Sequence, residues 1–174
     1  MTRTPHFLVN TLALKRGGLV KAVRERANAL AAQGTMPEVR IAVLAGQPRL
    51  QLDVEDLKRE GHLHPAVTAY SILYTLDAST SDKRTPYILD EGPGITVFPT
   101  GRSGREYRYF RDGIYEKYVR FDTGGRIEVV EYFDEARFRF RRDEMDELGC
   151  LARRLTYQQG SHTPTVQRFF GHDS

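Results

Sequence analysis

A short aromatic and turn-forming unit recurs through residues 105–170 and constrains the fold more than any other feature of the sequence. Aromatic residues favour strands, and Asp-Gly or Asp-x-x-Gly closes a tight turn with a residue at positive φ. Copies at roughly 11–14 residue spacing are typical of hairpins in a repetitive antiparallel sheet, so we expect a β-meander over residues 86–174. The clearest copies are residues 109–113 (YFRDG), 120–125 (RFDTGG) and 131–134 (EYFD); residues 146–149 (DELG) and 168–171 (RFFG) are partial copies.

The first part of the chain alternates apolar runs with amphipathic segments. Residues 6–14 are an apolar run that we interpret as a strand buried on both faces, and residues 39–45 as a second buried strand. Between them a glycine pair leads into a helix from about Leu19 to Gly34, with Arg24 on its solvent face. This order is that of a βαβ unit, so residues 1–85 predict a Rossmann-like N-terminal half-domain.

Further elements follow before the repeats begin. We expect a second helix over residues 50–60, and then a strand over residues 66–73, for which a helix running on to Leu76 is the alternative. The polar residues 77–86 are the expected domain boundary. Short strands over residues 87–90 and 95–98 would then lead into the sheet.

Composition narrows the class of protein only slightly. The net charge of +3, from 26 basic and 23 acidic residues, permits an anionic partner without requiring one, and we expect no nucleic-acid partner. A single cysteine, Cys150, excludes an intrachain disulfide and fits a reducing compartment. We find no signal peptide and no apolar run near the ~18–20 residues of a membrane span. We therefore expect a cytoplasmic protein without a transmembrane segment, and peripheral membrane contact stays open.

The strongest local candidate for ligand binding is the glycine pair Gly17 and Gly18. A glycine turn before a helix lets a phosphate approach free backbone N–H groups, and Lys15 and Arg16 would add attraction. The pattern is neither G-x-G-x-x-G nor a Walker loop, so classical dinucleotide binding is not expected. A plain tight turn explains the pair equally well.

Arginines interleave with aromatic residues in the repeats, and Arg137, Arg139 and Arg141 are the densest group. Alternate residues of a strand share a face, so these arginines would lie opposite Phe138 and Phe140. Such a face could hold an anionic polymer, or it could be a solvated surface over an aromatic core. His62 and His64 lack further ligands at matching spacing, so we expect no metal site, and no pattern indicates a catalytic residue.

The glycine turn with its helix, followed by the aromatic repeats, resembles a family of bacterial glycosyltransferases. These are the poly(glycerol-phosphate) alpha-glucosyltransferases and the accessory Sec system glycosyltransferases, in which a β-rich extension is inserted into the N-terminal half of a two-Rossmann enzyme. The resemblance implies retaining transfer from a nucleotide sugar, usually UDP-linked, to a hydroxyl of a teichoic acid or a protein. It places Gly17 and Gly18 near the donor phosphates, and it gives the sheet a role in acceptor contact or assembly.

The sequence departs from that family in one respect. The second Rossmann domain, with its basic pair and E-x7-E motif, does not occur before Ser174, so the chain resembles an N-terminal portion that is inactive alone. A glycosyltransferase portion is therefore the first hypothesis, with a UDP-sugar donor and no other cofactor. A non-catalytic acceptor-binding or assembly module, forming homo- or hetero-oligomers through the sheet, is the second. A nucleotide-binding protein of another class is the third.

Overall fold

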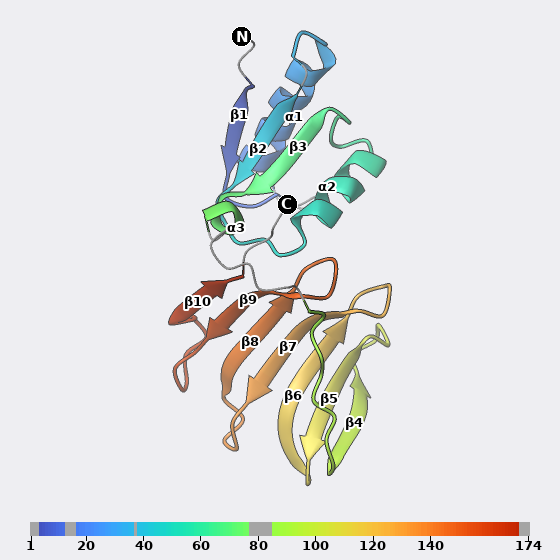
Figure 1. Ribbon diagram of the computed structural model, residues 1–174, viewed down its shortest axis with the longest axis vertical. Coiled ribbons are helices and arrows are strands. Elements are labelled where there is room, and N and C mark those ends of the chain that lie inside the picture. The colour runs from blue at the N-terminus through green and yellow to red at the C-terminus, as the bar shows by residue number, and fades with distance from the viewer. Residues whose placement is uncertain (1–3, 13–16, 37, 77–84, 171–174) are drawn as a thin grey trace. The chain divides into compact units, whose positions relative to one another are not determined.

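The computed structural model describes residues 4–12, 17–36, 38–76 and 85–170 (Figure 1), and two compact units are present. One unit falls within residues 1–80 and is called the helical unit; the other falls within residues 81–170 and is called the sheet unit. Most of the predicted boundary, residues 77–84, lies outside the described residues. The division at residues 85 and 86 therefore stays a prediction.

The helical unit is a parallel sheet of three strands in the order β1-β2-β3, and α1 and α2 pack against it. Strands and helices alternate along the chain, as the sequence predicted. Residues 66–76 divide between the two alternatives, because the strand ends at Ser71 instead of residue 73 and the helix to Leu76 begins only at Ile72. The elements are β1 (His6–Val9), α1 (Leu19–Ala32), β2 (Val39–Val43), α2 (Leu50–Arg59), β3 (Val67–Ser71) and α3 (Ile72–Leu76).

Only one face of this sheet is covered within the described part of the chain. Val9, Ile41 and Val67 point into a core shared with the helices. On the other face, His6 is exposed and contacts the ring of Tyr70 edge-on. The prediction that residues 6–14 are a strand buried on both faces is therefore wrong. β1 is an edge strand of a sheet that is covered on one side, so its side chains alternate between core and solvent.

The prediction that Arg24 faces solvent is also wrong. Arg24 is only 7% exposed and lies on the buried side of α1 with Ala27 and Ala31. It stands three residues before Ala27 and seven before Ala31, which are the spacings of one helical face. The predicted end of the helix is confirmed, because Gly34 follows it with φ +65°.

The sheet unit confirms the antiparallel meander, with seven strands paired in chain order. Residues 87–90 do not form the expected strand; they belong to a segment that crosses one face of the sheet, where Tyr87 and Leu89 pack on its core (Figure 1). The strands are β4 (Ile95–Thr100), β5 (Glu106–Arg111), β6 (Ile114–Phe121), β7 (Ile127–Phe133), β8 (Arg139–Met145), β9 (Leu151–Thr156) and β10 (Val166–Phe169).

The repeated aspartates make the hairpin turns. The Oδ1 atoms of Asp122, Asp134 and Asp146 each accept a backbone N–H hydrogen bond of 2.8 Å from residues that follow in the turn. The fourth residue of each turn has positive φ: 78° at Gly125, 63° at Arg137 and 80° at Gly149. The recurring sequence unit is thus a recurring turn, in which a side-chain cap and a left-handed residue reverse the chain.

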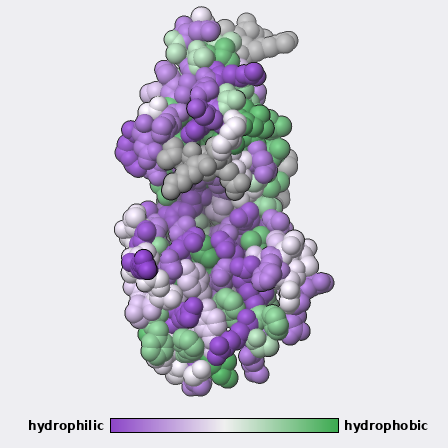
Figure 2. Space-filling model, turned by 180° about the vertical axis from the view of Figure 1, so that it is seen from behind, coloured by the Kyte–Doolittle hydropathy of each residue, from purple (hydrophilic) through white to green (hydrophobic). Residues whose placement is uncertain are grey.

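The two faces of the sheet unit differ. One face carries the core, in which Tyr109, Val119, Val130 and Met145 are buried. The other face carries a row of aromatic rings from four strands, with centroid distances of 5.5, 5.4 and 4.7 Å between neighbours. Seen from behind (Figure 2), the sheet unit shows hydrophobic patches separated by hydrophilic side chains. The row consists of Phe98, Phe110, Tyr115 and Phe133.

Candidate functional site

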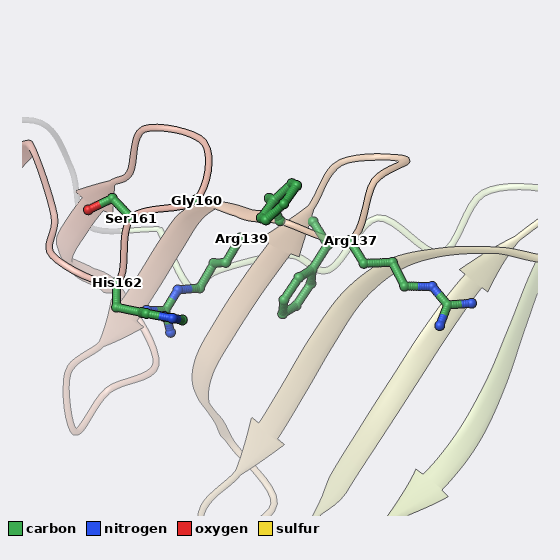
Figure 3. Close-up of a pocket in the computed structure, with 7 residues that line it drawn as sticks. Arg137, Arg139, Gly160, Ser161 and His162 are labelled. Atoms are coloured by element: carbon green, nitrogen blue, oxygen red, sulfur yellow. The ribbon is translucent and has the colours of Figure 1, made fainter.

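A pocket of about 290 Å³ lies at one end of the aromatic row, where the β7–β8 turn meets the loop after β9. We call it the arginine pocket. Figure 3 shows Arg139 and His162 extending into the same space, whereas the Arg137 side chain extends away from them. The lining residues are Phe133, Arg137, Phe138, Arg139, Gly160, Ser161 and His162.

Arg139 is the cation held most firmly at the pocket. Its guanidinium lies over the ring of Tyr157, 4.2 Å from the centroid, and its Nη1 donates to Glu131 at 2.6 Å. The Nε atom is buried and finds no hydrogen-bond partner among the described residues. Stacking on Tyr157 and the ion pair with Glu131 therefore hold this guanidinium in one position at the pocket.

The surrounding charges leave a positive surplus. Glu131 also accepts from Arg142 at 2.9 Å, Arg142 donates to Glu144 at 2.8 Å, and Arg153 donates to Glu144 at 2.8 Å. Three arginines thus share two glutamates, and Arg137 is exposed with no ion-pair partner among the described residues. Asp134 and Glu135 lie in the same turn as Arg137 and offset its charge, so the excess of one cation lies around Arg139, which can attract an anion.

Arg137 occupies the turn at a position that glycine holds in the two related turns. Its φ of 63° is uncommon for a residue with a side chain, and only Asp112 shares this property among the described non-glycine residues. Backbone strain of this kind clusters at functional sites, so the strained turn at Arg137 is a reason to look for a function there.

Replacing Arg137 with glycine should leave the fold intact and raise the free energy of unfolding by about 0.5 kcal/mol. Glycine removes the left-handed strain but makes the unfolded chain more flexible, so the two effects largely cancel. Chemical denaturation of the purified chain measures this change. Gly149→Ala, which puts a side chain at the equivalent position with φ 80°, should destabilise instead. A loss above about 1 kcal/mol for Arg137→Gly would show that the arginine has a structural role.

Arg141 does not join the other two arginines. Tyr132 pairs with Arg141 and Phe133 with Arg139, so Phe140 is an extra residue that forms a bulge. Because the bulge reverses the alternation of side chains, Arg139 and Arg141 lie on opposite faces of the sheet. The prediction of one face carrying Arg137, Arg139 and Arg141 is therefore wrong: Arg137 is in the turn, and Arg141 is on the core face.

On that core face, Arg141 belongs to a buried polar network around Asp143. Arg141 and Arg154 donate to the Asp143 carboxylate at 2.9 and 2.8 Å, and the Tyr87 hydroxyl bonds to both Tyr132 and Asp143. Burial alone would raise the pKa of Asp143, but the hydrogen bonds from the two arginines outweigh it and hold the pKa below its usual range. Burial raises the pKa of Tyr87, so that hydroxyl keeps its proton. This network is structural.

The glycine pair in the helical unit is open to solvent. Gly17 and Gly18 are exposed, a Cβ at either would meet no atom within 4 Å, and Gly18 has φ 58°. The first turn of α1 has no side-chain cap. Free backbone donors therefore remain at this helix end, as phosphate binding requires. Lys15 and Arg16, the predicted partners of the pair, lie outside the described residues.

Sequence reasoning missed Glu131, Tyr157 and His162. Glu131 comes from β7 and Tyr157 from the residue after β9, so both reach Arg139 only once the strands have paired. His162 follows a Gly-Ser pair that carries no functional pattern. The described residues contain no cluster of metal-ligating side chains. His64 accepts a backbone N–H hydrogen bond from Ala66 at 3.2 Å.

No helix in the described part of the chain has the length and apolar character to span a membrane.

No protein-family model matches the sequence, and no curated protein is significantly similar to it. Several solved structures share its fold. A complex of accessory secretory proteins 1, 2 and 3 from Streptococcus pneumoniae is similar at 15% identity and TM-score 0.67, covering 97% of this chain and 35% of that one. The Glycosylation Associate Protein complex (Gap123) from Streptococcus agalactiae is similar at 15% identity and TM-score 0.67, covering 97% of this chain and 34% of that one.

TarM is similar at 13% identity and TM-score 0.60, covering 97% of this chain and 39% of TarM. A variant of S. aureus TarM, solved in complex with fondaparinux, alpha-GlcNAc-glycerol and UDP, is similar at 12% identity and TM-score 0.58. The chain thus spans little more than a third of the length of these proteins. The resemblance to the teichoic-acid and accessory-Sec glycosyltransferases is therefore confirmed as a shared fold, which this chain has over nearly its whole length.

Proposed function

We propose that this chain is the N-terminal portion of a glycosyltransferase that moves a sugar from a nucleotide-sugar donor to a hydroxyl of a cell-wall polymer or protein. The shared fold supports this, since it covers 97% of the chain, and a TarM variant with that fold was solved with UDP and alpha-GlcNAc-glycerol. Because the chain spans about a third of those proteins, transfer is proposed only for a protein that also supplies a C-terminal nucleotide-binding domain. The helical unit is then part of a Rossmann-like domain of a cytoplasmic enzyme.

The glycine pair is the proposed contact with the donor diphosphate. Exposed backbone donors at Gly17 and Gly18 support this role, and Lys15 and Arg16 would add charge. A UDP-sugar is the proposed donor. Titration of the chain with UDP, UDP-sugars and NAD would distinguish a protein that binds nucleotide sugars from other nucleotide-binding proteins.

The arginine pocket is the proposed contact with an anionic acceptor, such as a teichoic acid. The observation that carries this proposal is the excess of one cation around Arg139, whose guanidinium is held over the Tyr157 ring beside the exposed ring of Phe138. Arg141 has no part in it, because its guanidinium is committed to Asp143 on the other face.

Arg139→Gln should weaken binding of a glycerol-phosphate oligomer by about tenfold or more, since a charge-assisted hydrogen bond is worth about 1.5–3 kcal/mol. Arg137→Gly should weaken it less, because that side chain extends away from the pocket. Isothermal titration at low and high salt measures both effects, and added salt should reduce the difference. Arg108→Gln, elsewhere on the sheet, is the matched control. Equal binding by all variants would refute the acceptor role of the pocket.

A non-catalytic acceptor-binding or assembly module is the second candidate. The edge strand β4 favours it, because Val97 and Phe98 are 41% and 53% exposed beside unpaired backbone groups. Homo- or hetero-oligomers would then form through the sheet. Sedimentation of a clean monomer would count against assembly, whereas acceptor binding without any nucleotide binding would favour this candidate.

A further inference from the structure

A second cavity, of about 480 Å³, lies in the sheet unit on the face opposite the arginine pocket. We call it the tyrosine cavity; Tyr107, Tyr109 and Phe121 form its walls, and Glu91 and Arg105 contribute to its lining. Tyr107 and Phe121 pack against the core of that face, whereas Phe110 belongs to the aromatic row on the other. Among the residues that line it, Val97 on the edge strand β4 is the one that the assembly role above involves. Its volume is within the ~300–1,000 Å³ that small-molecule pockets have.

The walls present aromatic surface in two planes. The rings of Tyr107 and Phe121 are 5.6 Å apart and nearly perpendicular, at 85°. The Tyr107 hydroxyl donates to the backbone carbonyl of Gly104 at 3.0 Å, which fixes that ring. A rigid corner of this kind offers the electron-rich face of one ring and the edge of another to a ligand with C–H groups.

The polar groups supply both hydrogen-bond functions. The Tyr109 hydroxyl donates to Glu91 at 3.4 Å, and burial followed by the charge of Glu91 raises the pKa of Tyr109 to about 12, so it remains a donor. The Glu91 carboxylate has further acceptor capacity. The Arg105 residue is exposed, and no described residue forms an ion pair with its guanidinium. Asp122 also lines the cavity, but its carboxylate accepts from two backbone N–H groups and pairs with Arg126 at 3.3 Å. The other carboxylate and the guanidinium, Glu91 and Arg105, favour a neutral ligand that both donates and accepts.

We propose that the tyrosine cavity binds a neutral pyranose unit of a glycan. A pyranose has C–H faces for the aromatic corner and hydroxyls for Glu91 and Arg105. An anionic ligand would meet Glu91 and a cationic one Arg105, each at a cost. Binding needs no sugar transfer, so the proposal goes beyond the proposed function and can fail or succeed separately from it.

Saturation-transfer NMR of the full chain with N-acetylglucosamine, methyl α-glucoside and maltose tests the proposal. We expect at least one sugar to bind with a Kd of about 1 mM, the affinity of a small ligand at ~0.3 kcal/mol per atom. Tyr107→Ala should abolish the signal, and Arg105→Gln, which changes an exposed residue and leaves the core intact, should weaken binding about threefold to tenfold.

The matched control is Phe98→Ala, which removes an exposed ring from the opposite face of the same sheet and should leave the sugar signal unchanged. Glycerol-phosphate binding at the arginine pocket should persist in Tyr107→Ala and Arg105→Gln, which separates the two sites. Absence of a signal from all three sugars at tenfold the expected Kd would overturn the proposal. Equal sugar binding by wild type, Arg105→Gln and Tyr107→Ala would also overturn it. A preference of the protein for an apolar peptide over every sugar would do the same.

Discussion

Replacing Asp143 with alanine should lower the free energy of unfolding of the sheet unit by about 3 kcal/mol. The Asp143 side chain is fully buried, while Arg141 and Arg154 remain 30% and 31% exposed. Without the carboxylate, two guanidinium groups would face each other, and the Tyr87 hydroxyl would lose one of its partners. Chemical denaturation of wild type and variant, followed by circular dichroism, measures the difference.

The same carboxylate predicts how stability depends on pH. The arginine hydrogen bonds hold the pKa of Asp143 below its usual range despite burial. A carboxyl with a lowered folded pKa stabilises the protein above its unfolded pKa of about 3.9, and that contribution is lost as pH falls through the folded value. Wild type should therefore lose stability below about pH 4, and Asp143→Ala should lose less over the same range.

Glu128→Ala is the matched control for Asp143→Ala. Glu128 pairs with Arg120 at 2.9 Å on the opposite face, where both side chains are about a third exposed. An exposed pair contributes less than about 1 kcal/mol, so the control should change stability little. If the two substitutions cost the same, the buried network does not stabilise the sheet unit as argued.

Arg24→Met should raise the free energy of unfolding of the helical unit by about 1–3 kcal/mol. Arg24 is 7% exposed, and its Nε and Nη1 atoms are buried without a hydrogen-bond partner among the described residues. Methionine fills much of the same volume and has no donors to desolvate. Thermal and chemical denaturation of the variant measure the gain.

Arg26→Met serves as the control, because Arg26 is exposed on the same helix. Its effect should stay within about 0.5 kcal/mol. A loss of stability in Arg24→Met would show that the buried guanidinium has a stabilising role that its described surroundings do not explain. A gain limited to phosphate-free buffer would instead indicate that an anion satisfies Arg24.

Turn chemistry explains how far the sequence predicted the sheet. Asp122, Asp134 and Asp146 cap their own turns through bonds to residues two or four positions away, so a local pattern is sufficient to predict each hairpin. The helix end that Gly34 follows is equally local. Such interactions depend on neighbours in the chain, which is why the sequence shows them.

The candidate site was predicted only in part. Arg137 and Arg139 do line one pocket, whereas Arg141 belongs to a structural network on the opposite face. A single bulge at Phe140 made the difference, and strict alternation along the strand cannot reveal a bulge. The roles of the glycine pair and of the arginine pocket in binding stay predictions.

The sequence by itself determined the hairpins, the alternation of helices and strands in the first unit, and the concentration of arginine in the repeats. Only the tertiary structure decided which arginines share a face, that Arg24 is buried, and that Tyr157 stacks on Arg139. The physical reason is the range of the interactions. Caps and turns act within a few residues, whereas register, bulges and burial depend on segments that meet only when the sheet and its core have formed.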